Sequence, residues 1–272
     1  PTHSYPRCPD MENVSSIAST ACVKFQSWGK IFALNIRCFV GNALFVMILL
    51  VKEEFIVKNG VKINFILPNS AASKTNVSLN VGDVITAVNG KEIGKNINFY
   101  SLLKNSSGNE ILLSLASAKE VVVRTESTRT IRDLCYEEWV NSRKKLVEKY
   151  SNGQLGYIHI QGMNWESFER FERELTAAGL GKEGIVIDVR YNGGGWTTDY
   201  LMAVLTVKQH AYTIPRGAAK DLKKEHKNFR EHYAFGERLP FASWTKPSIA
   251  LCNESSYSNA EIFSHAYKNN EI

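Results

Sequence analysis

The chain has 272 residues, 44% of them hydrophobic and 22% charged, a composition typical of a globular protein with one large or two modest domains. Its formal net charge is +6, but Lys and Arg are spread along the chain without a dense basic run, so nucleic acid is disfavoured as a partner. Five scattered cysteines without a C-x-x-C spacing indicate neither a disulfide framework nor a zinc site.

The first 57 residues contain the most apolar segment of the chain, Phe39 to Val51. This segment is shorter than the about 20 apolar residues needed to span a bilayer, so we expect a buried strand or helix and no membrane partner. The sequence starts at Pro1 and stops at Ile272 inside an apolar helical pattern. We therefore interpret it as part of a longer protein, with residues 1–57 as the remnant of a preceding helical domain or an atypical insert.

Residues 58–128 predict a small β-rich module. Alternating β-branched and apolar residues predict strands within 61–67 and 82–93, followed by strands at 110–116 and 120–125. Asn89-Gly90 is a strong signal for a two-residue hairpin, and residues 98–105 predict one short helix. The expected structure is a compact, barrel-like sandwich.

Residues 129–272 predict alternating helices and strands. A helix at 130–150 is followed by strands at 155–163, 184–190 and 247–253, with helices at 167–179, 197–207 and 258–269. Strands separated by helical patterns of this length predict a parallel α/β layer.

The first chemical signal is "NGGG", Asn192 to Gly195, directly after a buried strand. Three glycines allow a sharp turn and leave bare N–H groups that can approach a phosphate or a developing oxyanion. A phosphate loop is disfavoured, because neither a Lys-Ser/Thr pair nor a G-x-G-x-x-G spacing is present.

The second signal is the serine-rich stretch "NESSYSNAEIFS", which joins the last strand to the last helix. A serine at such a junction is either a helix N-cap or a nucleophile with the next N–H as an oxyanion donor. Ser258 and Glu261 also fit a capping box, so the local pattern alone favours the cap.

Five blocks in this order resemble one known family. They are "GDVITAVNG", "INFYSLLKN", "YEEWVNSRKKLVEKYSNGQLGYIHI", "GIVIDVRYNGGG" and "NESSYSNAEIF". The first is similar to the PDZ signature of bacterial proteases, carried here by Leu79, Gly82, Asp83, Ile85, Val88, Asn89 and Gly90. Together the blocks resemble the serine peptidases that unite carboxyl-terminal processing proteases with the tricorn core protease, the tricorn branch being the closer. The resemblance implies an α/β (α+β) fold: a PDZ-like domain at 58–128, then a crotonase/ClpP-like catalytic core at 129–272, truncated at its C-terminus.

The resemblance also implies a set of site residues. The family's nucleophile maps to Ser258, and the oxyanion donors map to the N–H of Asn259 and one from the Gly193–Gly195 turn, foremost Gly194. Asn259 departs from the alanine of the processing branch and the aspartate of the tricorn branch, although the donor is a backbone N–H in each case. The tricorn-type base maps to His3 in "PTHSY"; the alternative is a residue beyond the end of the chain.

The other histidines have simpler interpretations. His159 is the other candidate for the base, but it alternates with Tyr157 along a strand, so a hydrogen-bonded strand residue is the favoured interpretation. His265 is expected to pack in the last helix. His210, His226 and His232 lie in a polar segment that is expected to be a solvated loop and helix.

The predicted function is that of a serine endopeptidase for short or unfolded peptides, with no metal and no organic cofactor. The resemblance further implies a homo-oligomer and a cytoplasmic location, with a periplasmic or other extracytoplasmic one as the alternative. Two other functions stay open: a non-catalytic binding protein on the same fold, and an inactive truncated fragment. Retention of both "NGGG" and the S-x-S turn favours the peptidase.

Overall fold

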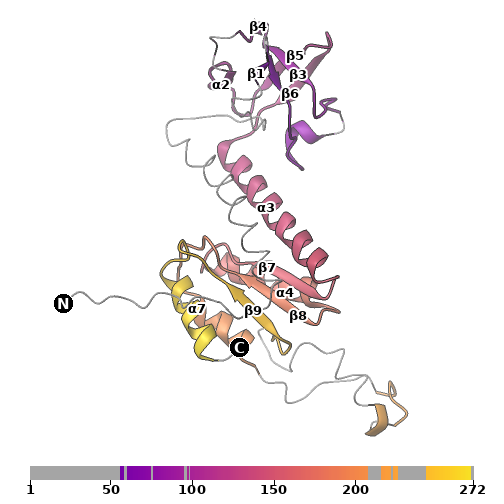
Figure 1. Cartoon of the computed structure of the whole chain (residues 1–272), viewed down its shortest axis with the longest axis vertical. Helices are drawn as coiled ribbons and strands as arrows, with labels where there is room; N and C mark the ends of the chain where they lie inside the picture. Colours follow the sequence, from indigo (N-terminus) through magenta and orange to yellow (C-terminus); the bar gives the residue numbers. More distant parts are fainter. Residues whose placement is uncertain are drawn as a thin grey trace, which may run out of the picture. The chain divides into compact units, whose positions relative to one another are not determined.

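The computed structural model describes residues 56–57, 60–74, 76–94, 97, 99–207, 216–221, 223–225 and 243–270. They fall into two compact units that divide between Leu134 and Cys135 (Figure 1). The predicted domain boundary between residues 128 and 129 stays a prediction. His3 and the apolar segment from Phe39 to Val51 lie outside the described residues. Among the residues described, no helix has the length and apolar character needed to cross a membrane.

The first unit is an antiparallel sheet with order β1-β2-β3-β5-β6, and β4 pairs with β3. Its strands are β1 (Ile56–Val57), β2 (Gly60–Lys62), β3 (Val84–Val88), β4 (Lys91–Glu92), β5 (Glu110–Leu115) and β6 (Glu120–Arg124). Two short helices accompany them, η2 (Ala71–Ser73) and α2 (Phe99–Leu102). The predicted hairpin is confirmed: Asn89 and Gly90 join β3 to β4 with φ of 48° and 75°, as a type I′ turn requires.

The second unit confirms the predicted alternation of helices and parallel strands. Its elements are α3 (Thr128–Tyr150), whose first residues belong to the first unit, β7 (Leu155–His159), α4 (Trp165–Gly179), β8 (Gly184–Asp188), α5 (Thr198–Leu205), β9 (Ser248–Leu251) and α7 (Asn259–Asn269). The strands form a parallel sheet in the order β7-β8-β9, with all of β8 buried at its centre. The fold class is therefore the predicted one, an antiparallel PDZ-like sheet followed by a parallel α/β sheet.

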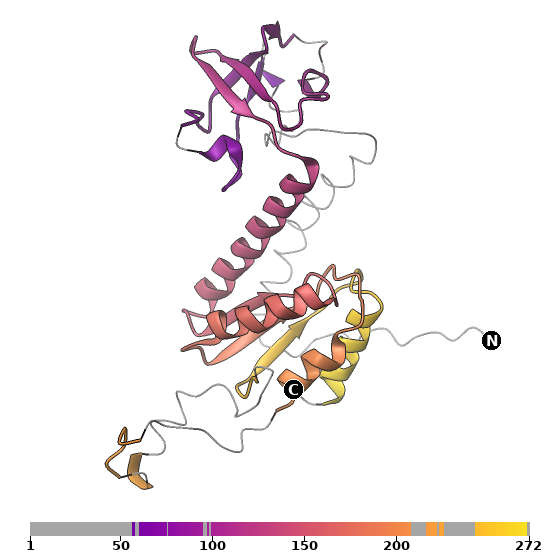
Figure 2. The same ribbon diagram turned by 180° about the vertical axis from the view of Figure 1, so that it is seen from behind.

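Helices cover both faces of the parallel sheet (Figure 2). Ile158 and Ile187 belong to a core shared with buried side chains of α4, α5 and α7, such as Phe168 and Phe263. Their neighbours on the strands face the other way, where Tyr157 and Val186 pack against Val140 of α3. Because strand side chains alternate between faces, this arrangement makes three layers.

The register of the sheet places three strand ends side by side. His159 pairs with Asp188, and Asp188 pairs with Leu251, so β7, β8 and β9 end at one edge. The segments that leave β8 and β9, residues 189–197 and 252–258, therefore emerge next to each other. The carboxyl edge of a parallel sheet is where α/β proteins place their sites.

Candidate active site

Asn192 organises the turn that follows β8. Its side chain is fully buried, donates from Nδ2 to the carbonyl oxygen of Ile160 at 2.9 Å, and accepts from the Gly194 N–H at Oδ1, also at 2.9 Å. The Asn192 carbonyl oxygen accepts a hydrogen bond from the N–H of Tyr257 at 2.9 Å. One residue thus ties the glycine turn to the end of β7 and to the serine-rich turn. Nothing in the amino-acid pattern distinguished this role.

Gly194 lies directly against Ser258. A Cβ built on Gly194 would lie 2.7 Å from the Ser258 Cβ and 2.7 Å from the Tyr257 carbonyl oxygen. The φ of Gly194 is 89°, a conformation in which glycine carries no steric penalty. The two motifs identified in the sequence therefore meet in space, and only a glycine allows them to meet this closely.

Ser258 adopts a strained backbone conformation at the start of α7. Its φ is 54° and its ψ is −119°, outside the regions that non-glycine residues populate. Such a residue costs of order 1–3 kcal/mol and persists only where its surroundings impose it, most often at functional sites. The Ser258 N–H donates to the Glu261 carboxylate at 2.8 Å, which is the reciprocal half of the predicted capping box. Ser258 is exposed.

The other serines of the stretch have structural or no assigned roles. Ser256 is buried; its Oγ donates to the Val189 carbonyl oxygen at 2.8 Å and accepts from the Asn253 N–H at 3.0 Å. The Ser264 Oγ donates to the Ala260 carbonyl oxygen at 2.9 Å, a bond within α7. Ser255 is exposed beside the turn. Only Ser258 combines exposure, backbone strain and contact with the glycine turn.

Asn259 joins the starts of α5 and α7. Its Oδ1 accepts from the Thr198 N–H at 3.0 Å and from the Thr198 hydroxyl at 2.9 Å, and that hydroxyl also lies 2.8 Å from the Asn259 carbonyl oxygen. An asparagine side-chain oxygen has two lone pairs and can accept both bonds from Thr198. The two helix N-termini, each with a partial positive charge, are thereby held together.

The N–H groups at the turn differ in availability. The Gly194 N–H already donates to the Asn192 side chain, whereas the structure shows no hydrogen bond from the N–H of Gly193 or of Asn259, both described residues. Gly194 stays a prediction as an oxyanion donor, and to act as one its N–H must exchange Asn192 for the substrate oxygen. Gly193 supplies an N–H from the same turn without that exchange.

Both ring nitrogens of His159 are engaged in hydrogen bonds. Its Nε2 donates to the Arg190 carbonyl oxygen at 2.9 Å, which leaves Nδ1 to accept from the Tyr136 hydroxyl at 2.9 Å. The Trp139 ring lies edge-on at 4.7 Å between ring centroids. The expectation of a hydrogen-bonded strand histidine is confirmed, and burial lowers the pKa of its imidazole.

A buried ion pair supports this side of the sheet edge. The Arg190 guanidinium contacts the fully buried Asp188 carboxylate at 2.5 Å, and the Tyr157 hydroxyl donates to the same carboxylate at 2.8 Å. A buried charge requires such partners, so Asp188 is satisfied internally and is not available as a base.

His265 differs from its prediction. It is exposed on α7, with its Nε2 2.8 Å from the Asn269 amide, rather than packed. The apolar face of that helix is formed instead by Phe263 and Tyr267, both buried, so the core needs no third ring from position 265.

His210, His226 and His232 lie outside the described residues. Among the residues described, no cluster of His, Cys, Asp or Glu could hold a metal ion.

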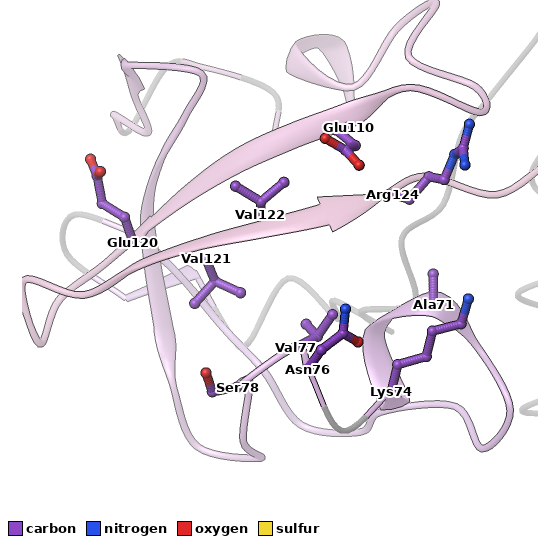
Figure 3. Close-up of a pocket in the computed structure, with 10 residues that line it drawn as sticks. All are labelled: Ala71, Lys74, Asn76, Val77, Ser78, Glu110, Glu120, Val121, Val122 and Arg124. Atoms are coloured by element: carbon purple, nitrogen blue, oxygen red, sulfur yellow. The ribbon is translucent and has the colours of Figure 1, made fainter.

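A separate pocket lies in the first unit, with a volume of about 410 Å³ (Figure 3). Lys74, Val77 and Ser78 border it on one side, and the edge strand β6 borders it on the other with Val122 and Arg124. Val122 is 53% exposed, and β6 pairs only with β5 among the described strands. An unpaired strand edge beside a pocket is a place where an extended peptide can add as a strand.

Because Gly194 contacts Ser258 and a Cβ on Gly193 would contact nothing nearby, we expect alanine substitutions at these two glycines to change stability by very different amounts. Gly194→Ala places a methyl group on Ser258 at a positive φ and should lower the free energy of unfolding by about 2–5 kcal/mol. The control Gly193→Ala meets no atom within 4 Å and should change it by less than about 0.5 kcal/mol. Urea unfolding followed by far-UV circular dichroism measures both; equal effects would contradict the close approach.

The lowered pKa of buried His159 predicts that the protein loses stability in acid. Because burial lowers its folded-state pKa, the unfolded chain binds a proton at a higher pH than the folded chain does. The contribution of neutral His159 to the free energy of unfolding is complete above about pH 6.5. It is lost as the pH falls through that value, by at most about 1.4 kcal/mol per pH unit. His159→Gln keeps an amide donor and acceptor without titrating, so its unfolding free energy should fall less between about pH 7 and 5. Identical pH slopes for the two proteins would refute this.

Comparison with known proteins agrees with this architecture. Residues 154–272 match peptidase family S41, and residues 67–133 match the tricorn protease PDZ domain. The tricorn protease homolog of Saccharolobus solfataricus is 31% identical over 194 residues, 71% of this chain and 16% of that protein. The putative tricorn-like protease C-terminal subunit of Sulfurisphaera tokodaii is 29% identical over 194 residues, 71% of this chain and 20% of that protein.

The chain therefore spans about a fifth or less of the length of these relatives. The crystal structure of the tricorn protease shares the fold, with a TM-score of 0.55 and 22% identity over 78% of this chain and 21% of that one. The order of the two matched regions is the order of the two units described above. The chain thus carries a region of peptidase family S41, preceded by a PDZ domain of the tricorn type.

Proposed function

We propose that this chain forms part of a serine endopeptidase in which Ser258 is the nucleophile. The observation that carries the proposal is the strained, exposed Ser258 packed against Gly194. A helix N-cap needs neither a left-handed φ nor a glycine turn in contact with it. Both are what a nucleophile needs, because they project the hydroxyl outward and bring N–H groups beside it.

The proposed reaction is acyl transfer. A base takes the proton from the Ser258 Oγ as the oxygen attacks the peptide carbonyl carbon, and the same proton is given to the departing amine. The resulting ester is hydrolysed by water, which returns the hydroxyl to Ser258. No metal or organic cofactor enters these steps.

The oxyanion would be bound by main-chain N–H groups. The Asn259 N–H is proposed as one donor, because Asn259 starts α7 and this N–H has no hydrogen-bond partner among the described residues. The second donor comes from the Gly193–Gly195 turn, from Gly193 directly or from Gly194 after release of Asn192. Removing one such donor typically costs about 3–4 kcal/mol of transition-state stabilisation.

The base is proposed to be His3 or a residue that follows residue 272 in the full-length protein. His159 does not fit this role, because both of its ring nitrogens are held by Tyr136 and Arg190. Asp188 is paired with Arg190 and does not fit either. In this proposal the described residues supply the nucleophile and the oxyanion donors, and the base is His3 or a residue that follows residue 272.

Peptide or unfolded polypeptide is the proposed substrate, and the PDZ unit is proposed to position it. The pocket beside β6 offers an unpaired strand edge for that purpose (Figure 3). A binding protein on the same fold is the rival function. It would gain nothing from backbone strain at Ser258, which is the observation that disfavours it.

Exchange of single serines tests the proposal in the full-length protein that carries this chain. Ser258→Ala should abolish labelling by a fluorophosphonate and lower peptide hydrolysis by a factor on the order of 10⁴ or more. Ser255→Ala, an exposed serine of the same stretch, should keep both activities.

Two results would contradict the assignment. One is an unlabelled wild-type protein that hydrolyses no peptide, and the other is labelling that persists in Ser258→Ala. His3→Ala, compared with His265→Ala as an exposed histidine control, tests the base separately. Loss of hydrolysis in the first variant alone supports His3, and activity in both excludes it.

A further inference from the structure

Three exposed aromatic side chains form one cluster in the second unit. Trp165 begins α4, Trp196 follows the glycine turn and Tyr200 lies in the first turn of α5. They are 42%, 57% and 36% exposed, respectively. We call these three residues the aromatic cluster.

The rings of the aromatic cluster contact one another in fixed geometry. Trp165 and Trp196 are parallel, with 3° between planes and 6.3 Å between centroids. Tyr200 meets both edge-on, at 5.7 and 5.8 Å. Phe168, buried below, contacts Trp165 at 5.3 Å and Tyr200 at 5.7 Å. The cluster is therefore assembled before any ligand arrives, which reduces the entropy lost on binding.

The chain path places this cluster beside Ser258. Gly194, two residues before Trp196, contacts Ser258. Thr198, two residues after Trp196, donates its N–H to the Asn259 side chain at 3.0 Å. Trp196 therefore lies between two residues that contact the serine-rich turn. Two residues of chain reach at most about 7 Å. The Trp196 backbone thus lies within about 11 Å of the Ser258 side chain, a distance that an extended peptide covers in about three residues.

Acidic side chains near the aromatic cluster favour apolar and cationic peptide side chains over anionic ones. Glu166 and Asp199 are exposed on the first turns of α4 and α5, and Glu169 is exposed just beyond the first turn of α4. None of the three forms an ion pair within the described residues. Glu169 accepts a hydrogen bond from the Trp165 indole at 2.9 Å. An apolar ring surface edged by carboxylates attracts apolar and cationic groups and repels anionic ones.

We propose that the aromatic cluster is a substrate subsite that binds a large apolar or aromatic side chain, about three residues from the bond cleaved at Ser258. The inference rests on the proposed peptidase function and names its substrate class. The exposed rings gain free energy by burying the substrate side chain, and the acidic edge excludes Asp and Glu from the same position.

Paired peptides test the subsite in the full-length protein. The two members of a pair are identical except for Phe or Asp at one of the four positions on either side of the scissile bond. One position should show a kcat/KM ratio of roughly 10- to 100-fold in favour of Phe. Trp196→Ala should bring that ratio toward one, and Trp196→Phe should restore most of it. Tyr150→Ala, an exposed aromatic at the end of α3, should leave the ratio as in the wild type.

The outcomes separate this inference from the proposed function. If fluorophosphonate labels the wild-type protein but no position prefers Phe, or the preference survives Trp196→Ala, the subsite is wrong and the peptidase stands. If the wild-type protein is neither labelled nor active on peptides, the subsite fails together with the peptidase. If Trp196→Ala changes the oligomeric state in sedimentation velocity and not the ratio, the cluster is a subunit contact and the inference is overturned.

Discussion

The contact between Gly194 and Ser258 is the constraint on which the rest of the site depends. The missing Cβ at position 194 lets the turn after β8 touch the turn after β9, and the parallel register of the sheet brings both turns to one edge. Ser258 is held there at φ 54°, so its hydroxyl is directed by the backbone and not by a choice of rotamer alone. Backbone strain at one serine is thus maintained by packing at one glycine.

Hydrogen bonds that two asparagines accept or donate keep this contact in place. Asn192, fully buried, holds the glycine turn to β7 and to the residue before Ser258, while Asn259 holds the start of α7 to Thr198 on α5. Each asparagine forms hydrogen bonds through its side-chain amide and through its main-chain carbonyl oxygen. In this arrangement the Asn259 side chain faces Thr198, and the Asn259 N–H has no hydrogen-bond partner among the described residues.

Much of this could be predicted from the sequence because local patterns determine it. Strand and helix periodicity, the Asn89-Gly90 hairpin and the junction at Ser258 are all properties of short segments, and the structure confirms them. The role of Asn192, the aromatic cluster and the partners of His159 depend on residues more than twenty positions apart, so no local pattern contains them. The exposure of His265 was mispredicted because helical periodicity leaves the edge of an apolar face ambiguous.

The position of a covalent adduct shows whether Ser258 in the turn before α7 is the nucleophile. The full-length protein would be reacted with a fluorophosphonate, digested, and its peptides sequenced by mass spectrometry. We expect a single phosphonate adduct, on the Ser258 Oγ. An adduct on Ser255, Ser256 or Ser264, or on a serine outside this turn, would contradict it.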